Sequence, residues 1–199
     1  MALVKDAAFF ERIEGEVDRL AAGDETSLIP VIRRSAELHL RHITNGGDPF
    51  EMVTARPLDF GHWSAHRIEQ LSGYSIRHGE AVAVGIALDV MYSALAGRLS
   101  VTDADRIVRC LSRLGFETSH ELLARPQAIL DGLEEFREHL GGRLTIMVLE
   151  AIGRGVDVHQ VDTAMMAEAM RRLIADRTND DGRHDHGSAS PCKCATRPE

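Results

Sequence analysis

The sequence predicts an all-α domain, and three observations support this fold class. Apolar residues recur every three or four positions through most of the chain, which is the spacing of one face of an α-helix. Glycine-containing stops separate these segments, as they commonly do at helix ends. A hydrophobic content of 44% in 199 residues is enough for one buried core. We therefore expect a single multihelical domain over residues 1–175.

Seven segments carry the helical pattern. The fourth is almost wholly apolar, which is typical of a buried central helix. Thr102 or Asp103 can cap the start of the fifth. Residues 144–149 fit a strand as well as a helix, so the fold has room for one short hairpin. The predicted helices span residues 9–20, 28–43, 61–71, 79–95, 102–114, 126–139 and 162–174.

The last part of the chain differs in composition from the rest. Residues 176–199 are polar, contain Gly, Ser and Pro, and offer almost no apolar side chain that could anchor them, which predicts a disordered tail. Cys192 and Cys194 could bind a metal with nearby histidines, but a Cys-x-Cys pair in such a tail is more often incidental. Cys110 lies in an apolar segment, where we expect a buried small side chain rather than a nucleophile.

Charge and composition exclude several classes of protein. A net charge of −8 argues against a nucleic-acid partner, because phosphate binding requires a basic surface. The chain contains no stretch of 18 apolar residues, and its first residues do not form a signal-peptide pattern. Three cysteines do not make a disulfide framework. We therefore expect a cytoplasmic protein that binds neither nucleic acid nor a membrane.

Three histidines form the most informative motif. His62 and His66 are four residues apart and share one helix face, and His78 opens the next predicted helix. Isolated histidines in helical domains usually need no metal, but this spacing favours a transition-metal site. Either all three imidazoles are ligands, or one faces a substrate and a carboxylate completes the shell. Glu69 and Glu80 are the nearby carboxylates, and for Glu69 we favour a solvated or helix-pairing role.

These histidines lie in a string that resembles a family signature. Residues 58–69 read Leu-Asp-Phe-Gly-His-x3-His-x2-Glu, and residues 78–85 read His-Gly-Glu-Ala-Val-Ala-Val-Gly. Both segments resemble the signature of dehydroquinate synthases and related sugar phosphate cyclases. The resemblance covers residues 1 to about 175 and implies the helical C-terminal domain of the dehydroquinate synthase-like fold. It also implies that His62 and His78 bind the metal, whereas His66 faces the substrate.

Enzymes of that family oxidise a sugar-phosphate hydroxyl with NAD, eliminate phosphate, reduce the ketone again and close a carbocycle. Their metal, usually zinc, acts as a Lewis acid. The resemblance therefore implies Zn²⁺ or another divalent metal, and a phosphorylated sugar substrate. Asp59 stands where the family usually has Asn and Arg41 where it usually has Lys, so we take His66, Arg41 and Asp59 as the catalytic candidates. The acidic pair of the family falls on Asp48 and Glu51. These departures favour a divergent cyclase with a different sugar phosphate.

The family's remaining parts are not found in the sequence. Its third metal ligand, a glutamate, and its Gly-rich NAD-binding domain would precede Met1, and no dinucleotide fingerprint occurs. The resemblance thus implies a C-terminal half that works with an N-terminal NAD-binding half as a separate chain. In the isolated chain, the face that would pack on that half is exposed, and exposed contact faces favour self-association. We therefore expect the isolated chain to form a homodimer. The alternatives are an inactive remnant and a non-enzymatic metal-binding module.

Overall fold

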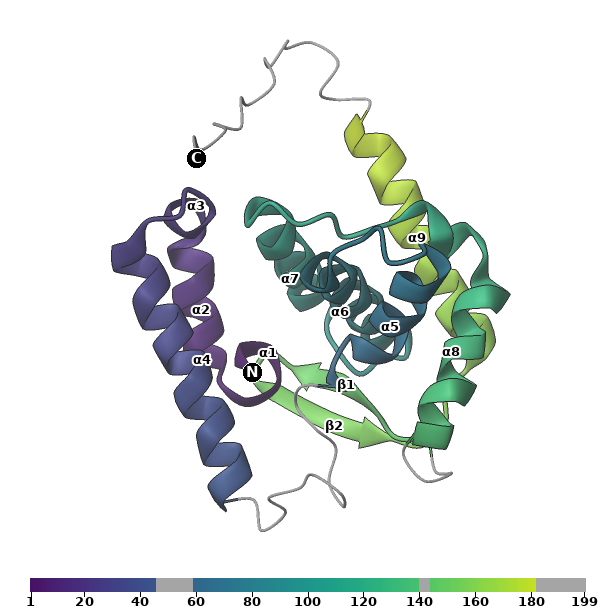
Figure 1. Cartoon of the computed structure of the whole chain (residues 1–199), viewed down its shortest axis with the longest axis horizontal. Coiled ribbons are helices and arrows are strands. Elements are labelled where there is room, and N and C mark those ends of the chain that lie inside the picture. Colours follow the sequence, from purple (N-terminus) through teal and green to yellow (C-terminus); the bar gives the residue numbers. More distant parts are fainter. Residues whose placement is uncertain (46–58, 140–143, 182–199) are drawn as a thin grey trace, which may run out of the picture.

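A computed structural model describes residues 1–45, 59–139 and 144–181 of the chain. Within these ranges the protein consists of helices and one two-stranded sheet (Figure 1). The predicted all-α class is therefore confirmed, together with the short hairpin for which the sequence left room. No helix among the described residues has the length and apolar character that crossing a membrane requires.

Four helices form the N-terminal part. The last three of them lie along one side of the molecule, whereas the first lies beside the two strands (Figure 1). The predicted helix over residues 9–20 is in fact two helices, because α2 ends at Gly15 and α3 begins at Val17. Glycine has a low helix propensity, which agrees with a break at this point. The four helices are α1 (Ala2–Lys5), α2 (Ala7–Gly15), α3 (Val17–Ala21) and α4 (Glu25–Asn45).

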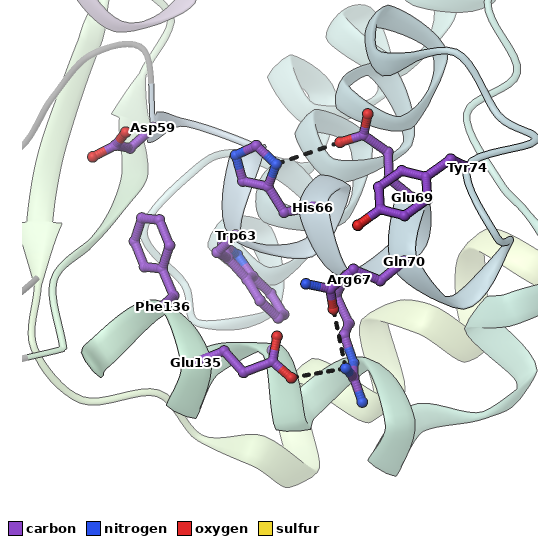
Figure 2. A pocket seen from close by; sticks show the side chains of 10 residues that line it. Asp59, Trp63, His66, Arg67, Glu69, Gln70, Tyr74, Glu135 and Phe136 are labelled. Carbon is purple, nitrogen blue, oxygen red and sulfur yellow. Dashed lines mark hydrogen bonds and ion pairs between the residues drawn. The ribbon is translucent and has the colours of Figure 1, made fainter. Parts of the chain in front are cut away.

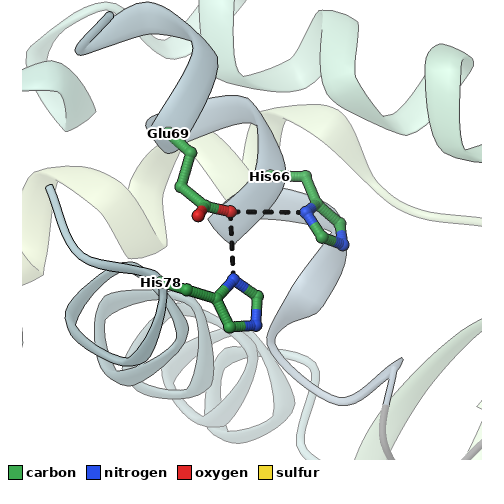
Figure 3. Close-up of side chains that lie close together, drawn as sticks. All are labelled: His66, Glu69 and His78. Carbon is green, nitrogen blue, oxygen red and sulfur yellow. Dashed lines mark hydrogen bonds and ion pairs between the residues drawn. The ribbon is translucent and has the colours of Figure 1, made fainter. Parts of the chain in front are cut away.

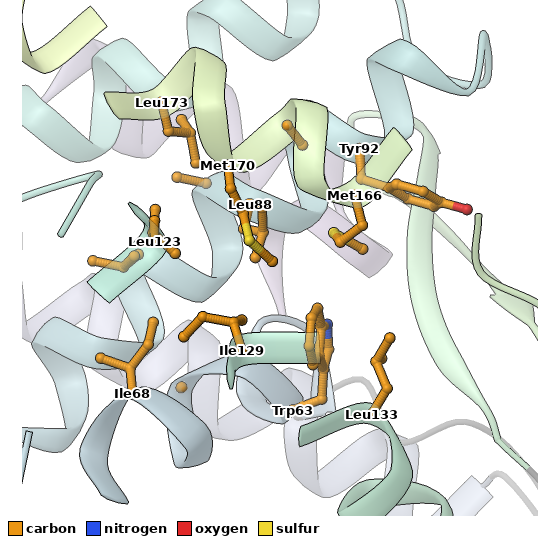
Figure 4. Packing of buried hydrophobic residues seen from close by; sticks show 14 of the residues in the cluster. Trp63, Ile68, Leu88, Tyr92, Leu123, Ile129, Leu133, Met166, Met170 and Leu173 are labelled. Carbon is orange, nitrogen blue, oxygen red and sulfur yellow. The ribbon is translucent and has the colours of Figure 1, made fainter. Parts of the chain in front are cut away.

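The core forms around α6 (His78–Leu95), which contacts α5 (His62–Leu71), α7 (Val101–Arg113) and α9 (Thr163–Asp181). Helix α8 (Pro126–His139) packs on α5, and a 3-10 turn, η2 (Glu121–Ala124), packs on α9. The apolar α6 is buried on most of its surface, as its composition predicted. Figure 4 shows the large side chains that meet in this core: Trp63, Ile68, Leu88, Ile129, Met166 and Met170.

The segment that fitted both strand and helix is a strand. Strand β1 (Ile146–Ala151) pairs antiparallel with β2 (Arg154–Val158), in a register that sets Ile146 opposite Val158. Gly153 makes the turn with φ 82°, a conformation that glycine adopts without strain, and its N–H donates to the carbonyl of Leu3. The first four residues of β1 are buried, and the strand contacts α6. Tertiary burial therefore explains why this strand reads as an unbroken apolar run.

Other helix ends also differ from the prediction, and two of them change its meaning. Ser100, rather than Thr102 or Asp103, caps α7, because its Oγ accepts the N–H of Asp103 at 3.0 Å. Helix α9 continues to Asp181, past the expected end at residue 174 and into the segment expected to be disordered. Asp48, Glu51 and the histidines and cysteines of the tail lie outside the described residues.

Candidate metal and substrate site

The site is built where α5 begins against the flank of α6. Gly61 precedes α5 with φ 80°, a left-handed conformation that favours glycine. Gly85 of α6 faces it so closely that a Cβ at position 85 would lie 1.9 Å from the carbonyl oxygen of Gly61. Two glycines therefore permit the backbones of the two elements to touch. This contact brings His62, the first residue of α5, beside His78, the first residue of α6.

The three imidazoles predicted to act together form a compact cluster. Ring centroids lie 5.3 Å apart for His62 and His78, 5.8 Å for His62 and His66, and 5.7 Å for His66 and His78. Two imidazoles on one tetrahedral zinc ion, with Zn–N bonds of about 2.0–2.1 Å, have centroids roughly 5 Å apart. The centroid separations are therefore close to that value. Among the described residues, the ligand atoms that all lie within 4.8 Å of one another are those of His66, Glu69 and His78, a group that does not include His62.

Glu69 lies between two of these rings (Figure 3). Its Oε2 atom is 3.1 Å from Nδ1 of His78 and 3.3 Å from Nδ1 of His66. In Figure 3 the second nitrogen of each ring lies on the side away from Glu69. Metal-binding histidines commonly give one ring nitrogen to a carboxylate and the other to the metal. Glu69 can thus orient both imidazoles, and its oxygen is also close enough to both to share an ion with them.

His62 is oriented by the backbone. Its Nδ1 lies 3.3 Å from the carbonyl oxygen of Phe60, so a protonated Nδ1 donates there and leaves Nε2 as the free ligand atom. Burial, reinforced by the neighbouring imidazoles of His78 and His66, lowers the pKa of His62. A lowered pKa favours the neutral imidazole, which is the form that binds a metal. The donor set of this structure therefore fits a divalent metal of the zinc type.

A pocket of about 370 Å³ adjoins the cluster (Figure 2). It lies between α5 and α8, and His66 and Glu69 belong to both the pocket and the histidine cluster. Among the described residues that line it, the one guanidinium is that of Arg67, which donates to Glu135 at 2.8 Å and to the carbonyl oxygen of Ala128 at 2.7 Å. The described lining is Asp59, Trp63, His66, Arg67, Glu69, Gln70, Tyr74, Gly132, Glu135 and Phe136. Its carboxylates and aromatic rings suit a hydroxylated ligand better than an anion.

The structure distributes the predicted site residues unequally. It brings His62, His66 and His78 together, and it places Asp59 at the edge of the pocket. Arg41 lies exposed on α4, and it is not among the described residues that line the pocket.

Of the two roles favoured for Glu69, the solvated one was wrong, because its side chain is only 15% exposed. The helix-pairing role is confirmed by its contact with His66 three residues earlier on α5, and Glu69 also contacts His78 of α6. Glu80 instead pairs with Arg77 at the start of α6. The spacing of Glu69, three residues after His66, could have revealed its position on the same helix face.

Asp89 was missed at the sequence level. It is 1% exposed and accepts hydrogen bonds from the backbone N–H of Gly61 and from the indole of Trp63, both at 2.8 Å. Burial raises its pKa to about 7, although these two hydrogen bonds act in the opposite direction. A signal was available, since Asp89 is the one charged residue in the apolar stretch 81–95.

Comparison with known proteins identifies the family. Residues 1–135 match the sequence model of the family described as 3-dehydroquinate synthase C-terminal. The chain belongs to the 3-dehydroquinate synthase family. Two 3-dehydroquinate synthases are similar to it: that of Xylella fastidiosa (strain 9a5c), 30% identical over 199 residues, and that of Xanthomonas campestris pv. campestris (strain 8004), 31% identical over 173 residues. These alignments cover 97% and 84% of this chain but 48% and 46% of the relatives. The chain thus spans about half the length of these curated synthases.

A solved structure shows the same fold. ValA, the 2-epi-5-epi-valiolone synthase from Streptomyces hygroscopicus subsp. jinggangensis 5008, was solved with NAD⁺ and Zn²⁺ bound. It is 26% identical to this chain and superposes with a TM-score of 0.80, over 88% of this chain and 48% of ValA. The expected dehydroquinate synthase-like fold is therefore confirmed, and a sugar phosphate cyclase shares it.

Proposed function

We propose that this chain is the metal- and substrate-binding half of a sugar phosphate cyclase. The observation that carries the proposal is the cluster of three imidazoles, each with its Nδ1 near an oxygen, beside a pocket in a chain of the 3-dehydroquinate synthase family. The proposed reaction class is elimination of phosphate from a sugar phosphate followed by closure of a carbocycle.

His62 and His78 are the proposed metal ligands, and Glu69 orients His78 and His66. When bound, Zn²⁺ or another divalent ion supplies Lewis-acid chemistry at a substrate oxygen. The imidazole of His66 borders the pocket, where it can accept or return a proton at a substrate hydroxyl. Asp59, at the pocket edge, is proposed to accept a hydrogen bond from a hydroxyl of the same substrate.

The phosphate requires a separate contact. The lining of the pocket includes three carboxylates, and its guanidinium already binds Glu135, so the pocket itself is poorly suited to an anion. We propose that Arg41, exposed on α4, binds the substrate phosphate once the site is complete. NAD would be held by an N-terminal half supplied as a separate chain, and without that half the chain would form a homodimer. The similarity to two different synthases leaves the substrate defined by class, a phosphorylated sugar.

The first experiment measures metal content after equilibrium dialysis against zinc. We would use the full chain with Cys192→Ser and Cys194→Ser, so that the tail thiols do not compete. One zinc per chain is expected, and this zinc should be lost in His62→Ala and His78→Ala. His159→Ala is the control and should retain zinc, because His159 is exposed and directly follows β2, outside the histidine cluster. Absence of bound zinc in the folded parent chain would refute the metal site and with it the proposed function.

Catalysis is tested on the metal-loaded chain. Phosphate release from a panel of sugar phosphates would be followed with NAD⁺ and an NAD-binding half present. Release that requires His66 supports the cyclase. Metal binding without release from any sugar phosphate would favour the non-enzymatic metal-binding module.

A further inference from the structure

The start of α5 is held by a buried carboxylate that belongs to another helix. Asp89 of α6 and Trp63 of α5 are each 1% exposed. Oδ1 of Asp89 accepts the indole N–H of Trp63, and Oδ2 accepts the backbone N–H of Gly61. These two donors flank His62 in the sequence, one residue before it and one after it. A single side chain therefore fixes the backbone and the neighbouring side chain on both sides of a proposed metal ligand.

Burying a carboxylate here is costly, and packing alone does not explain it. Taking an ionisable group out of water costs several kcal/mol unless its oxygens are well paired. An apolar residue at position 89 would suit the surrounding helix, whose other residues from 81 to 95 are uncharged. Both carboxylate oxygens instead accept hydrogen bonds from one short segment, residues 61–63. The contact thus specifies where this segment lies and how it is turned.

The backbone of α6 at Asp89 is held by a separate pair of hydrogen bonds. The Oγ of Ser93 donates to the carbonyl oxygen of Asp89 at 2.6 Å and accepts the N–H of Leu149 at 3.1 Å. These two hydrogen bonds join β1 to the backbone of α6, and neither involves the carboxylate of Asp89. Trp63 also lines the pocket, and Figure 2 shows its ring between Phe136 and Arg67. The position of the indole therefore affects one wall of the pocket as well.

We infer that Asp89 is a positioning residue for His62, acting through Gly61 and Trp63 to hold that imidazole in the orientation that binds the metal. This inference rests on the proposed function, since it assigns a role toward the metal of that site. Removing a residue that orients a metal ligand typically lowers metal affinity by about 10–100-fold.

The test uses Co²⁺ as the probe, because its absorption bands report both the affinity and the geometry of its ligands. The full chain with both tail cysteines replaced by serine would be titrated with Co²⁺ in parallel with Asp89→Asn and Trp63→Phe. Asn keeps the size of Asp89 but can accept from only one of the two N–H donors, and Phe removes the indole donor. Ser93→Ala is the matched control, because it removes two buried hydrogen bonds that involve neither the carboxylate of Asp89 nor residues 61–63.

We expect Asp89→Asn and Trp63→Phe to bind Co²⁺ about 10–100-fold more weakly than the parent chain, with altered absorption bands. Ser93→Ala should keep the affinity and bands of the parent chain, even where its Tm falls as much as that of the other two variants. Trp63 is the sole tryptophan, so a red shift of its emission in Asp89→Asn would show that the indole has been released. If Asp89→Asn does not fold, Trp63→Phe carries the test.

The possible failures can be told apart. A parent chain that binds no Co²⁺ would overturn the proposed metal site, and the inference with it. Wild-type affinity and bands in the folded Asp89→Asn and Trp63→Phe variants would overturn the inference alone. An equal loss of affinity in Ser93→Ala would also overturn it, because the effect would then be one of general destabilisation.

Discussion

Replacing Gly85 with alanine tests the contact on which the site is built. The added Cβ would lie 1.9 Å from the carbonyl oxygen of Gly61, about 1.6 Å closer than an ordinary van der Waals separation of roughly 3.5 Å. The atom it meets is backbone, so no side-chain rotation can relieve the overlap. The start of α5 must move away from α6, and the buried Trp63 and Ile68 of α5 would move with it.

The magnitude follows from this geometry. Overpacking a core costs typically about 1–3 kcal/mol, and a fixed backbone obstacle belongs at the upper end of that range. We therefore expect Gly85→Ala to lower the free energy of unfolding by about 3 kcal/mol. For a chain of 150–250 residues, that corresponds to a fall in Tm of roughly 6–12 °C. Zinc affinity should fall as well, because His62 moves with the start of α5.

Thermal and urea unfolding followed by circular dichroism would measure the change. Gly79→Ala is a matched control, because Gly79 lies on the same helix, is exposed, and has no heavy atom within 4 Å of a Cβ built on it. Alanine is favoured over glycine within helices by roughly 0.5–1 kcal/mol, so this variant should be unchanged or slightly more stable. Equal stability of Gly85→Ala and Gly79→Ala would refute the close contact between α5 and α6.

Three further predictions concern single side chains. Glu69→Gln should weaken zinc binding by about 10–100-fold in equilibrium dialysis, because a carboxylate that orients two imidazoles is lost; an unchanged affinity would contradict this role. The pKa of Asp89 is about 7 when folded and about 3.9 when unfolded, so the folded protein holds a proton between pH 4 and pH 7 that the unfolded chain does not. The free energy of unfolding of wild type relative to Asp89→Asn should therefore decrease from pH 4 to pH 7, by at most about 4 kcal/mol. Urea unfolding at each pH would measure it, and an increase in this difference with pH would contradict the prediction. Met170→Ala should cost about 2–5 kcal/mol through a core cavity, whereas the exposed Arg171→Ala should change stability by less than about 0.5 kcal/mol.

Local patterns in the sequence were sufficient for much of the fold. Apolar periodicity located α4, α5, α6 and α8 to within a few residues, because a helix must bury one face and its spacing is fixed. The same reasoning placed His62 and His66 on one helix face and His78 at the start of the next helix. These features depend on residues that are near one another in the chain, so the sequence determined them by itself.

Only the tertiary structure decided the features that join distant segments. Residues 146–149 of that ambiguous segment form a strand because β2 pairs with them and α6 packs against them, which no local pattern specifies. Glu69 became a partner of His78, and Asp89 a partner of residues 61–63, because the glycine contact sets α5 directly on α6. The environment of a carboxylate depends on what lies across the helix interface, and that information comes from packing rather than from spacing.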